Sequence, residues 1–350
     1  MSEKKIITYG DAGVDIEAGN RAVELMKKHV ESTFTSHVLR GLGSFGAMYQ
    51  MDDYYEGFNP VLVSSADGVG TKLKLAFMTG IHHTVGQCLV NHCANDIATQ
   101  GASPLFFLDY FATGKLDPLV AEQVVRGLSI ACLENECAII GGESAEMPDM
   151  YQIGEYDLAG FIVGMVKKDM LLTGEGIRPG DIAIGLASNG LHTNGYSLAR
   201  RLIFDEQKLG TSDMLPWEVS VADELMRIHH SYSKAILNLT QRGCIGSLIE
   251  GAAHVTGGGI PGNLVRILPE GCKAIINSAS WDVPPIFPYL QRAGNIPSSE
   301  MNKTFNNGIG FIVVVKKEKV EDVRWNLDQY NEKNWIIGEI VEGEREVVLV

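Results

Sequence analysis

The chain has 350 residues, of which 45% are hydrophobic, so it is long enough for about two domains with their own cores. Its formal net charge is −14, from 43 acidic and 29 basic residues. This balance disfavours long-range attraction to nucleic acid or to an anionic membrane. Any anionic ligand must be held locally, by backbone N–H groups of glycine loops, by helix N-termini, or by divalent cations bound to carboxylates.

The N-terminal stretch MSEKKIITYG lacks the apolar core of a signal peptide, and no later stretch approaches the ~20 apolar residues of a membrane helix. We therefore expect a cytoplasmic protein. The 6 cysteines form no CxxC pair, which predicts reduced, buried thiols. A zinc site made of Cys88, His92 and Cys93 is disfavoured, because no second ligand pair occurs at a zinc-binding spacing.

The first half of the chain alternates strand-length apolar runs with helical patterns. In 84–100, apolar Val85, Leu89, Cys93 and Ile97 recur every four residues, which predicts a helix that ends near Gly101. The pattern returns in 118–135. Strands are predicted at 61–66, 105–113, 137–140 and 159–166. This mixture predicts an α/β or α+β first domain.

Turn residues dominate 167–181, and strand, helix and glycine-loop signals begin again after them. We therefore predict two domains, 1–168 and 169–350. The second half is predicted to contain a helix at 195–203 and strands at 182–188, 252–256, 272–277 and 309–315, followed by a terminal pair around EGERE.

GLGSFG, from Gly41 through Gly43 to Gly46, satisfies the GxGxxG string of dinucleotide-binding folds. The flanking residues do not show the strand before it and the helix after it that the fingerprint requires. We interpret the stretch as a loop whose backbone can approach a ligand. A plain surface turn is the alternative.

SADGVGTKLKLA, residues 65–76, follows an apolar strand but is no Walker loop, because its lysine follows the threonine. Asp67 at the strand end can hold Mg²⁺, while Gly68, Gly70 and Thr71 let the backbone approach an anion. Lys72 would add a positive charge. A strand-end turn with a solvated lysine is an equally good reading of this stretch alone.

Two further acids follow ends of predicted elements. Asp96 lies four residues after His92, near the end of the helix, and Glu143 follows the strand and glycine pair of IIGGES. Three oxygen ligands, from Asp67, Asp96 and Glu143, would suit a hard cation that also bridges phosphates. Together they favour a nucleotide–Mg²⁺ site.

The second half offers two glycine turns before helices. In SNGLHTNGYSLARRL, Asn194 lies where the first helical N–H groups could bind an anion. His192 in this turn is the best general acid or base among the 9 histidines, although a histidine hydrogen-bonded within the turn is the alternative. Gly257 and Gly258 of TGGGIPG precede a proline that favours a first helical turn.

These motifs, in this order, resemble the phosphoribosylformylglycinamidine cyclo-ligase family, also called aminoimidazole ribonucleotide synthetases. The resemblance spans nearly the whole chain. It rests on GVDIEAGN, GLGSFGA, DGVGTKLKLA, NDIATQGASPLFFLDYFATGKLD, GGESAEMPDMY, LHTNGYSLAR, TGGGIPGNLVRILP and FNNGIGF. The chain departs from the pattern at Gln87 and Cys88, where an acid is expected, and at Asn306 and Asn307.

The resemblance implies an ATP- and Mg²⁺-dependent ring closure of formylglycinamidine ribonucleotide to aminoimidazole ribonucleotide, with release of ADP and phosphate. It implies an N-terminal mixed-sheet nucleotide-binding domain and a C-terminal α/β sandwich. In this reading Asp67, Lys72 and His192 are catalytic. The family also implies a homodimer formed through the first sheet, where the apolar stretch LFFLDYFAT offers a large surface.

Two alternatives remain open. A related ATP-dependent kinase or synthetase of the same superfamily would share the acid-and-glycine nucleotide loop while acting on another acceptor. A non-catalytic nucleotide-binding protein would keep the fold but is expected to lose an acid of the metal set, and none is lost here. LHTNGYSLAR and DYFATGKLD resemble the cyclo-ligases in particular.

Overall fold

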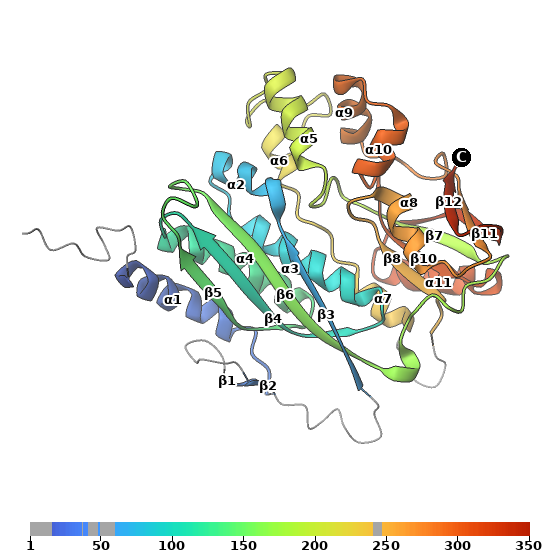
Figure 1. Ribbon diagram of the computed structural model, residues 1–350, viewed down its shortest axis with the longest axis horizontal. Helices are drawn as coiled ribbons and strands as arrows, with labels where there is room; N and C mark the ends of the chain where they lie inside the picture. Colours follow the sequence, from blue (N-terminus) through green and yellow to red (C-terminus); the bar gives the residue numbers. More distant parts are fainter. Residues whose placement is uncertain (1–15, 37, 41–47, 50–59, 241–246) are drawn as a thin grey trace, which may run out of the picture.

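A computed structural model describes residues 16–36, 38–40, 48–49, 60–240 and 247–350. Its two main sheets are a four-stranded sheet in the first half of the chain and a six-stranded sheet in the second half (Figure 1). A short antiparallel pair, β1 (Val38–Arg40) and β2 (Met48–Tyr49), stands apart from both. The expected two-part mixture of helices and strands is confirmed. Within the described residues, no helix is both long and apolar enough to span a membrane.

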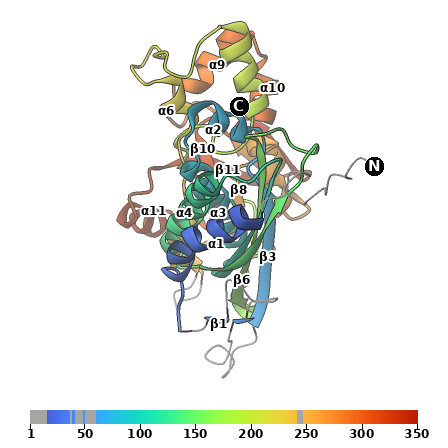
Figure 2. The ribbon, with the colours of Figure 1, turned by 90° about the vertical axis from the view of Figure 1, so that its left-hand side faces the viewer.

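The first sheet has the order β3-β6-β4-β5. Its strands are β3 (Pro60–Gly68), β4 (Ser103–Thr113), β5 (Ala138–Glu146) and β6 (Tyr156–Lys167). Three helices, α1 (Ile16–Glu31), α3 (His83–Ala98) and α4 (Pro118–Glu134), lie on one side of these strands (Figure 2). No described helix covers the other side of the sheet. The predicted strands and the two long helices are thus confirmed.

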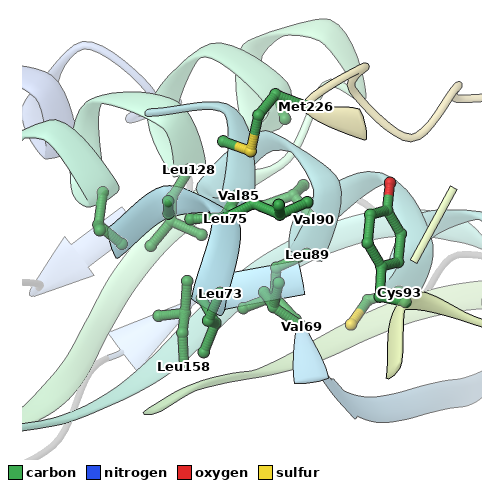
Figure 3. Close-up of a cluster of buried hydrophobic side chains, with 14 of the residues drawn as sticks. Val69, Leu73, Leu75, Val85, Leu89, Val90, Cys93, Leu128, Leu158 and Met226 are labelled. Atoms are coloured by element: carbon green, nitrogen blue, oxygen red, sulfur yellow. The ribbon is translucent and has the colours of Figure 1, made fainter. Parts of the chain in front are cut away.

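Helix α3 is the buried centre of the first domain. Its apolar residues Val85, Leu89 and Cys93 pack with Val69 and Leu158 of the sheet side, and Met226 of the second half joins the same cluster (Figure 3). Because the opposite side of α3 contacts the second half of the chain, nearly every α3 side chain is buried. The helix therefore belongs to the domain interface as much as to the first core.

Close approach of α3 and α4 depends on two glycines. A Cβ added to Gly86 would lie 2.3 Å from the Val124 oxygen, and one added to Gly127 would lie 1.9 Å from the His83 oxygen. No side chain fits at such distances. The two glycines therefore fix how tightly α4 holds α3 against the sheet.

The second sheet has the order β12-β9-β11-β7-β10-β8, with antiparallel neighbours except for β9 and β12. Its strands are β7 (Ile182–Ala187), β8 (Gly251–His254), β9 (Cys272–Ile276), β10 (Ile309–Val315), β11 (Asn334–Glu342) and β12 (Glu346–Leu349). The terminal pair, β11 and β12, does not pair internally, because β9 lies between the two strands. The second domain is nonetheless the expected α/β sandwich.

Both faces of the second sheet are covered. On β10, Phe311 and Val313 pack with α7 (Ser233–Thr240) and α11 (Val320–Gln329), whereas Ile312 and Val314 pack with α8 (Gly259–Leu264). Side chains alternate across a strand, so a strand that is buried on both faces is apolar throughout. This explains the unbroken apolar run IGFIVVV.

The remaining helices are short. They are α2 (Leu73–Thr79), α5 (Tyr196–Arg200), α6 (Val221–Leu225), α9 (Ile286–Gly294) and α10 (Ser298–Thr304), and a π-helical turn at Arg201–Glu206 extends α5. The first sheet ends at Lys167 and the second begins at Ile182, on either side of residue 168. The domain boundary at residue 168 itself stays a prediction.

Candidate active site at the domain interface

Two acids of the predicted metal set lie together at the domain interface. Asp67 is on β3, and Asp96 is near the end of α3, which packs against that strand. Ser65, two residues before Asp67, donates to Asp96 Oδ2 over 2.8 Å. Both acids are partly open, with side chains 36% and 31% exposed, so their oxygens can be reached by a ligand.

Each of these acids contacts a buried histidine. Asp67 Oδ2 lies 2.6 Å from His92 Nε2, and Asp96 Oδ1 lies 2.8 Å from His254 Nδ1. Burial acts to raise the pKa of both carboxyls, but the hydrogen bonds and charges of the histidines outweigh it and lower the pKa. Both carboxylates are therefore charged at neutral pH.

The two histidines differ in charge. Burial acts to lower the pKa of His92, but the hydrogen bond to Asp67 and the charges of Asp96 and Asp67 raise it. The pKa of His254 is lowered, because burial and the charge of His92 outweigh its contact with Asp96. His92 therefore forms an ion pair with Asp67, while a neutral His254 donates its Nδ1 proton to Asp96.

A chain of polar contacts joins these two pairs. His92 Nδ1 lies 2.6 Å from Thr193 Oγ1, which lies 3.3 Å from His229 Nδ1. His229 Nε2 in turn lies 3.0 Å from His254 Nε2. Residues of both domains are thus linked through buried imidazoles behind the two acids.

The asparagines of α3 hold the segment that carries His229. Asn91 Nδ2 donates to the His229 carbonyl and Asn95 Nδ2 to the His230 carbonyl, each over 2.8 Å. The Tyr232 amide donates back to Asn95 Oδ1 over 2.8 Å. These side chains are structural: they fix residues 229–232 along the helix.

The predicted glycine loops come together above this interface. Thr71 Oγ1 lies 2.9 Å from Ser197 Oγ in the first turn of α5. A Cβ on Gly257 would lie 3.4 Å from Asn194 Oδ1, so the turn before α5 adjoins the turn before α8. Gly258 has φ +97, which favours glycine. Loops of both domains therefore offer backbone groups to one region.

A cavity of about 530 Å³ opens between the two domains beside Asp96. The strand β3, helix α3, the segment 171–173, the end of β8 and the α8 region line it. Of the described lining residues, Arg266 is the only Lys or Arg, and His254 and Asn263 add polar groups. This composition suits a polar ligand with at least one anionic group.

Lys72 does not lie where the sequence suggested. Its side chain is fully buried, and Nζ donates to the carbonyls of His192, over 3.0 Å, and of Arg227, and lies 3.2 Å from Cys88 Sγ. The ammonium also lies 5.1 Å from the centre of the Tyr196 ring. In this arrangement Lys72 joins the two domains from the inside, and its catalytic role stays a prediction.

Glu143 is also separated from the other acids. Asp67, Gly160, Asp109 and Gly142 lie opposite one another across the four strands, which puts Gly142 roughly 14 Å from Asp67. A Cβ on Gly160 would contact Leu89 of α3, so this row faces the helices. Glu143, one residue further, faces the uncovered side. Within one chain the three predicted metal ligands therefore do not meet.

His192 is in the expected turn, with φ +61, but its ring is only 2% exposed and does not line the cavity. Burial and the neighbouring His254 and His230 lower its pKa well below the ordinary value. The pKa of His192 therefore differs from the ordinary value that the sequence suggested, while its role as a general base stays a prediction. The alternative of a ring hydrogen-bonded within the turn is wrong, because no described residue bonds either ring nitrogen.

The remaining predictions concern three loop glycines, the cysteines and the residues around the cavity. Gly41, Gly43 and Gly46 lie outside the described residues. Five cysteines are buried and unpaired, as expected, and Cys244 lies outside the described residues. The sequence reasoning missed His229, His254 and Arg266; the only available signal was their place beside glycine turns or, for His229, in an HH pair.

Family models match both halves of the chain. "AIR synthase related protein, N-terminal domain" matches residues 55–166, and "AIR synthase related protein, C-terminal domain" matches residues 178–350. A solved structure of thiamine-monophosphate kinase from Stenotrophomonas maltophilia K279a has a TM-score of 0.66 at 16% identity, covering 94% of this chain and 95% of that chain. One of hydrogenase maturation protein HypE in complex with ATP has a TM-score of 0.67 at 18% identity, covering 99% and 94%. These likenesses show the fold alone.

Curated relatives are much more similar. A phosphoribosylformylglycinamidine cyclo-ligase of Geobacter metallireducens is 51% identical, covering 97% of each chain. The protein of the same name from Syntrophotalea carbinolica is 50% identical over 100% of each chain. Because such identity extends over the whole length, the chain belongs to the phosphoribosylformylglycinamidine cyclo-ligase family and is an enzyme of purine biosynthesis.

Proposed function

We propose that this chain converts formylglycinamidine ribonucleotide and ATP to aminoimidazole ribonucleotide, ADP and phosphate. The observation that carries the proposal is the pair Asp67 and Asp96 beside the interdomain cavity, in a chain of this family. Acids on one side and glycine loops with Arg266 on the other fit a triphosphate and a phosphorylated substrate. The two ligands would meet between the domains.

The reaction has two steps. The formyl oxygen attacks the γ-phosphorus of ATP, and the bond to ADP breaks. An amidine nitrogen then bonds to the former formyl carbon, phosphate leaves with the oxygen, and the nitrogen loses a proton. Phosphoryl transfer depends mainly on positioning and on charge neutralisation, so the residues that hold the phosphates carry most of the catalysis.

Asp67 and Asp96 fit a magnesium ion. Each carboxylate already accepts two hydrogen bonds, from the Gly68 amide and His92 at Asp67, and from Ser65 and His254 at Asp96. A carboxylate has about four acceptor positions, so free lone pairs remain for a cation. Bound there with ATP, Mg²⁺ would neutralise phosphate charge. His92 and His254 orient the two acids toward it.

The loops around Gly68, Gly70, Thr71, Asn194, Gly257 and Gly258 would contact the phosphates of the two ligands. Gly70 has φ +66, and an added Cβ would meet no atom within 4 Å, so its backbone is open on that side. Arg266, on the cavity wall, is the residue we assign to the phosphate of the ribonucleotide. A guanidinium can bind a phosphate through two parallel hydrogen bonds.

We further propose a homodimer formed through the uncovered face of the first sheet. Leu62, Tyr110 and Phe161 are 60%, 39% and 41% exposed on that face, and Phe161 lies opposite Leu108. Exposed large apolar side chains on an uncovered sheet face are typical of an interface. Glu143 lies opposite Tyr110, so it would lie where two copies meet.

The direct test incubates the purified chain with formylglycinamidine ribonucleotide and Mg-ATP and follows both products by chromatography. We expect aminoimidazole ribonucleotide and ADP in equal amounts. Omitting the ribonucleotide is the control for ATP hydrolysis alone. ADP formation without aminoimidazole ribonucleotide, or no reaction with this substrate, would contradict the proposed activity and favour another acceptor.

A further inference from the structure

Three histidines of the second half of the chain converge behind the proposed active site. His192 comes from the loop after β7, His229 from the segment before α7, and His254 from the end of β8. One ring nitrogen of each lies within 4.8 Å of those of the other two, and all three residues are buried. Neighbouring buried imidazoles from three segments are an arrangement that transition metals use.

The ring of His192 is the most telling part of this cluster. Neither Nδ1 nor Nε2 has a hydrogen-bond partner among the described residues, although the residue is only 2% exposed. Buried polar nitrogens are rarely left unpaired, and an unpaired one in a native fold calls for an explanation such as an ion. The ring is held by stacking on His229, with ring centres 4.1 Å apart.

A glycine makes room for this ring. A Cβ added to Gly310 would lie 2.5 Å from His192 Cε1 and 2.1 Å from the Tyr232 hydroxyl. Any side chain at position 310 would therefore displace the imidazole. The fold thus accommodates an unbonded histidine at a position that a simple apolar residue could have filled.

The other two rings have the contacts of metal-binding histidines. His254 donates from Nδ1 to Asp96, which leaves the lone pair of Nε2 toward the cluster. His229 Nε2 lies 3.0 Å from that nitrogen, and Thr193 Oγ1 lies 3.3 Å from His229 Nδ1. A histidine whose second nitrogen bonds a carboxylate or hydroxyl is oriented as a ligand.

A second group of possible ligands, His92, Asp96 and His254, is the weaker candidate. His92 uses one nitrogen on Asp67 and the other on Thr193, both over 2.6 Å. Both nitrogens are therefore engaged. In the first group, binding costs the contact between His229 and His254 and also a rotation of His192 out of its stack on His229, because stacked rings direct their lone pairs side by side rather than at one ion. The His229 proton can then move to Nδ1, next to Thr193.

We propose that His192, His229 and His254 bind a divalent transition-metal ion of the zinc class. Three neutral imidazoles suit Zn²⁺ or Co²⁺, whereas Mg²⁺ prefers oxygen ligands, so this site is chemically distinct from the nucleotide site. The cavity of about 530 Å³ reaches His254 and gives the ion an entry path. A bound ion would hold His254 and, through it, Asp96.

The test uses full-length protein without an affinity tag, treated with a chelator and then dialysed. One equivalent of Zn²⁺ is added in the presence of excess Mg²⁺, and retained zinc is measured by mass spectrometry. We expect about one tightly held ion per chain, and Co²⁺ should give the visible absorption of a low-coordinate site. No zinc retained above the level of His192→Gln would overturn the proposal.

Variants locate the site. His229→Gln should weaken zinc binding by roughly 100-fold or more, since even outer contacts of metal ligands contribute 10- to 100-fold. His230→Gln, its immediate neighbour outside the cluster, is the matched control and should bind as the parent does. If His92→Gln loses zinc while His229→Gln keeps it, the ion belongs to the other group and the proposal is wrong.

The parent protein alone provides a check that does not depend on the folding of any variant. X-ray absorption at the zinc edge should show nitrogen ligands with the outer-shell scattering of about three imidazoles. A shell of oxygen ligands, or of one imidazole, would contradict the assignment.

Discussion

The two sheets of this molecule are covered differently. The six-stranded sheet has apolar cores on both faces, whereas the four-stranded sheet has helices on one face and exposes Leu62, Tyr110 and Phe161 on the other. A strand buried on both faces is apolar throughout; a strand buried on one face alternates. The second sheet is complete within one chain. The uncovered face of the first sheet is where we propose that a second copy binds.

The same difference decides which acids can act together. Asp67 faces the helices and meets α3 and the second domain, while Glu143 faces the uncovered side. Both residues follow an apolar stretch in the sequence, yet they lie on opposite faces of one sheet. An acid can therefore join the site only if its side chain points to the helix-covered side of the sheet. Its position near the end of a strand is not enough.

The largest effect is expected from Asp67→Asn. A metal-held phosphate contributes several kcal/mol to phosphoryl transfer, so turnover should fall by roughly 10³-fold or more, with the fold unchanged by circular dichroism. Rates at limiting Mg²⁺ provide the measurement. A near-normal rate there would show that Asp67 does not hold the metal.

Glu143→Gln is the matched comparison for this variant. We expect a smaller loss, because Glu143 cannot reach the same ion within one chain. An equal loss would contradict a site built by one chain alone and would require Glu143 of a second copy to complete it.

The next largest effect is expected at the uncovered face of the first sheet. Phe161→Asp places a charge on the proposed interface, where a hot-spot change contributes about 2 kcal/mol or more to association. Light scattering should change from twice the chain mass of 38.1 kDa to that mass itself. Trp325→Asp, on an exposed position of α11, should leave the dimer intact. A parent that is already monomeric would refute the dimer.

Much of the fold follows from the sequence, because apolar runs and fourfold periodicity are local signals. VLVSSA and the Val85–Leu89–Cys93 pattern predicted β3 and α3 correctly. Asp67 and Asp96 lie together because β3 and α3 pack directly. Glu143 was misplaced because strand register, which sets its face and distance, depends on pairing between segments far apart in the chain.

Lys72 shows a second reason why local sequence does not predict the position of a side chain. A lysine after DGVGT predicts a solvated or phosphate-binding charge, but the partners of its ammonium are 16, 120 and 155 residues away. Only the packing of the second domain makes those carbonyls available. The histidine cluster could not be predicted for the same reason, because His192, His229 and His254 are far apart in the sequence.

A smaller effect is expected at the cavity wall. Arg266→Gln should raise the KM for the ribonucleotide by roughly 10- to 100-fold, since hydrogen bonds to charged groups contribute about 1.5–3 kcal/mol. The KM for ATP should change little. Arg292→Gln, a surface variant on α9, is the control. If the KM for ATP rises instead, Arg266 belongs to the nucleotide.

The smallest expected effect is on the pH dependence of stability, to which the buried histidines contribute. The pKa of His92 at the interface is raised, whereas burial lowers the pKa of the three clustered rings, His192, His229 and His254. Groups with a lowered pKa bind protons more readily in the unfolded chain below their ordinary pKa of 6.5. Their contribution to the free energy of unfolding should therefore fall between pH 7.5 and 5.5, a window around the ordinary value of ~6.5. The raised pKa values of His92, His230 and Asp109 act in the opposite direction, so the contribution of the three rings is measured as a difference between the parent and a variant.

His229→Gln isolates one such contribution. A ring that stays neutral in the folded protein lowers the free energy of unfolding by about 1.4 kcal/mol at one pH unit below its ordinary pKa. The variant should therefore lose roughly 1 kcal/mol less of its free energy of unfolding on acidification than the parent does. Urea unfolding at both pH values, with zinc removed, measures the difference. His230→Gln should change the pH dependence in the opposite direction. The contact with Glu332 raises the pKa of His230, so this contact stabilises the fold at low pH and the stabilisation is lost as pH rises. That control effect should be small, because the His230 side chain is 39% exposed. Equal acid-induced losses in the parent and in His229→Gln would mean that the cluster gains protons in the folded state, and the neutral imidazoles inferred for the second domain would then be wrong.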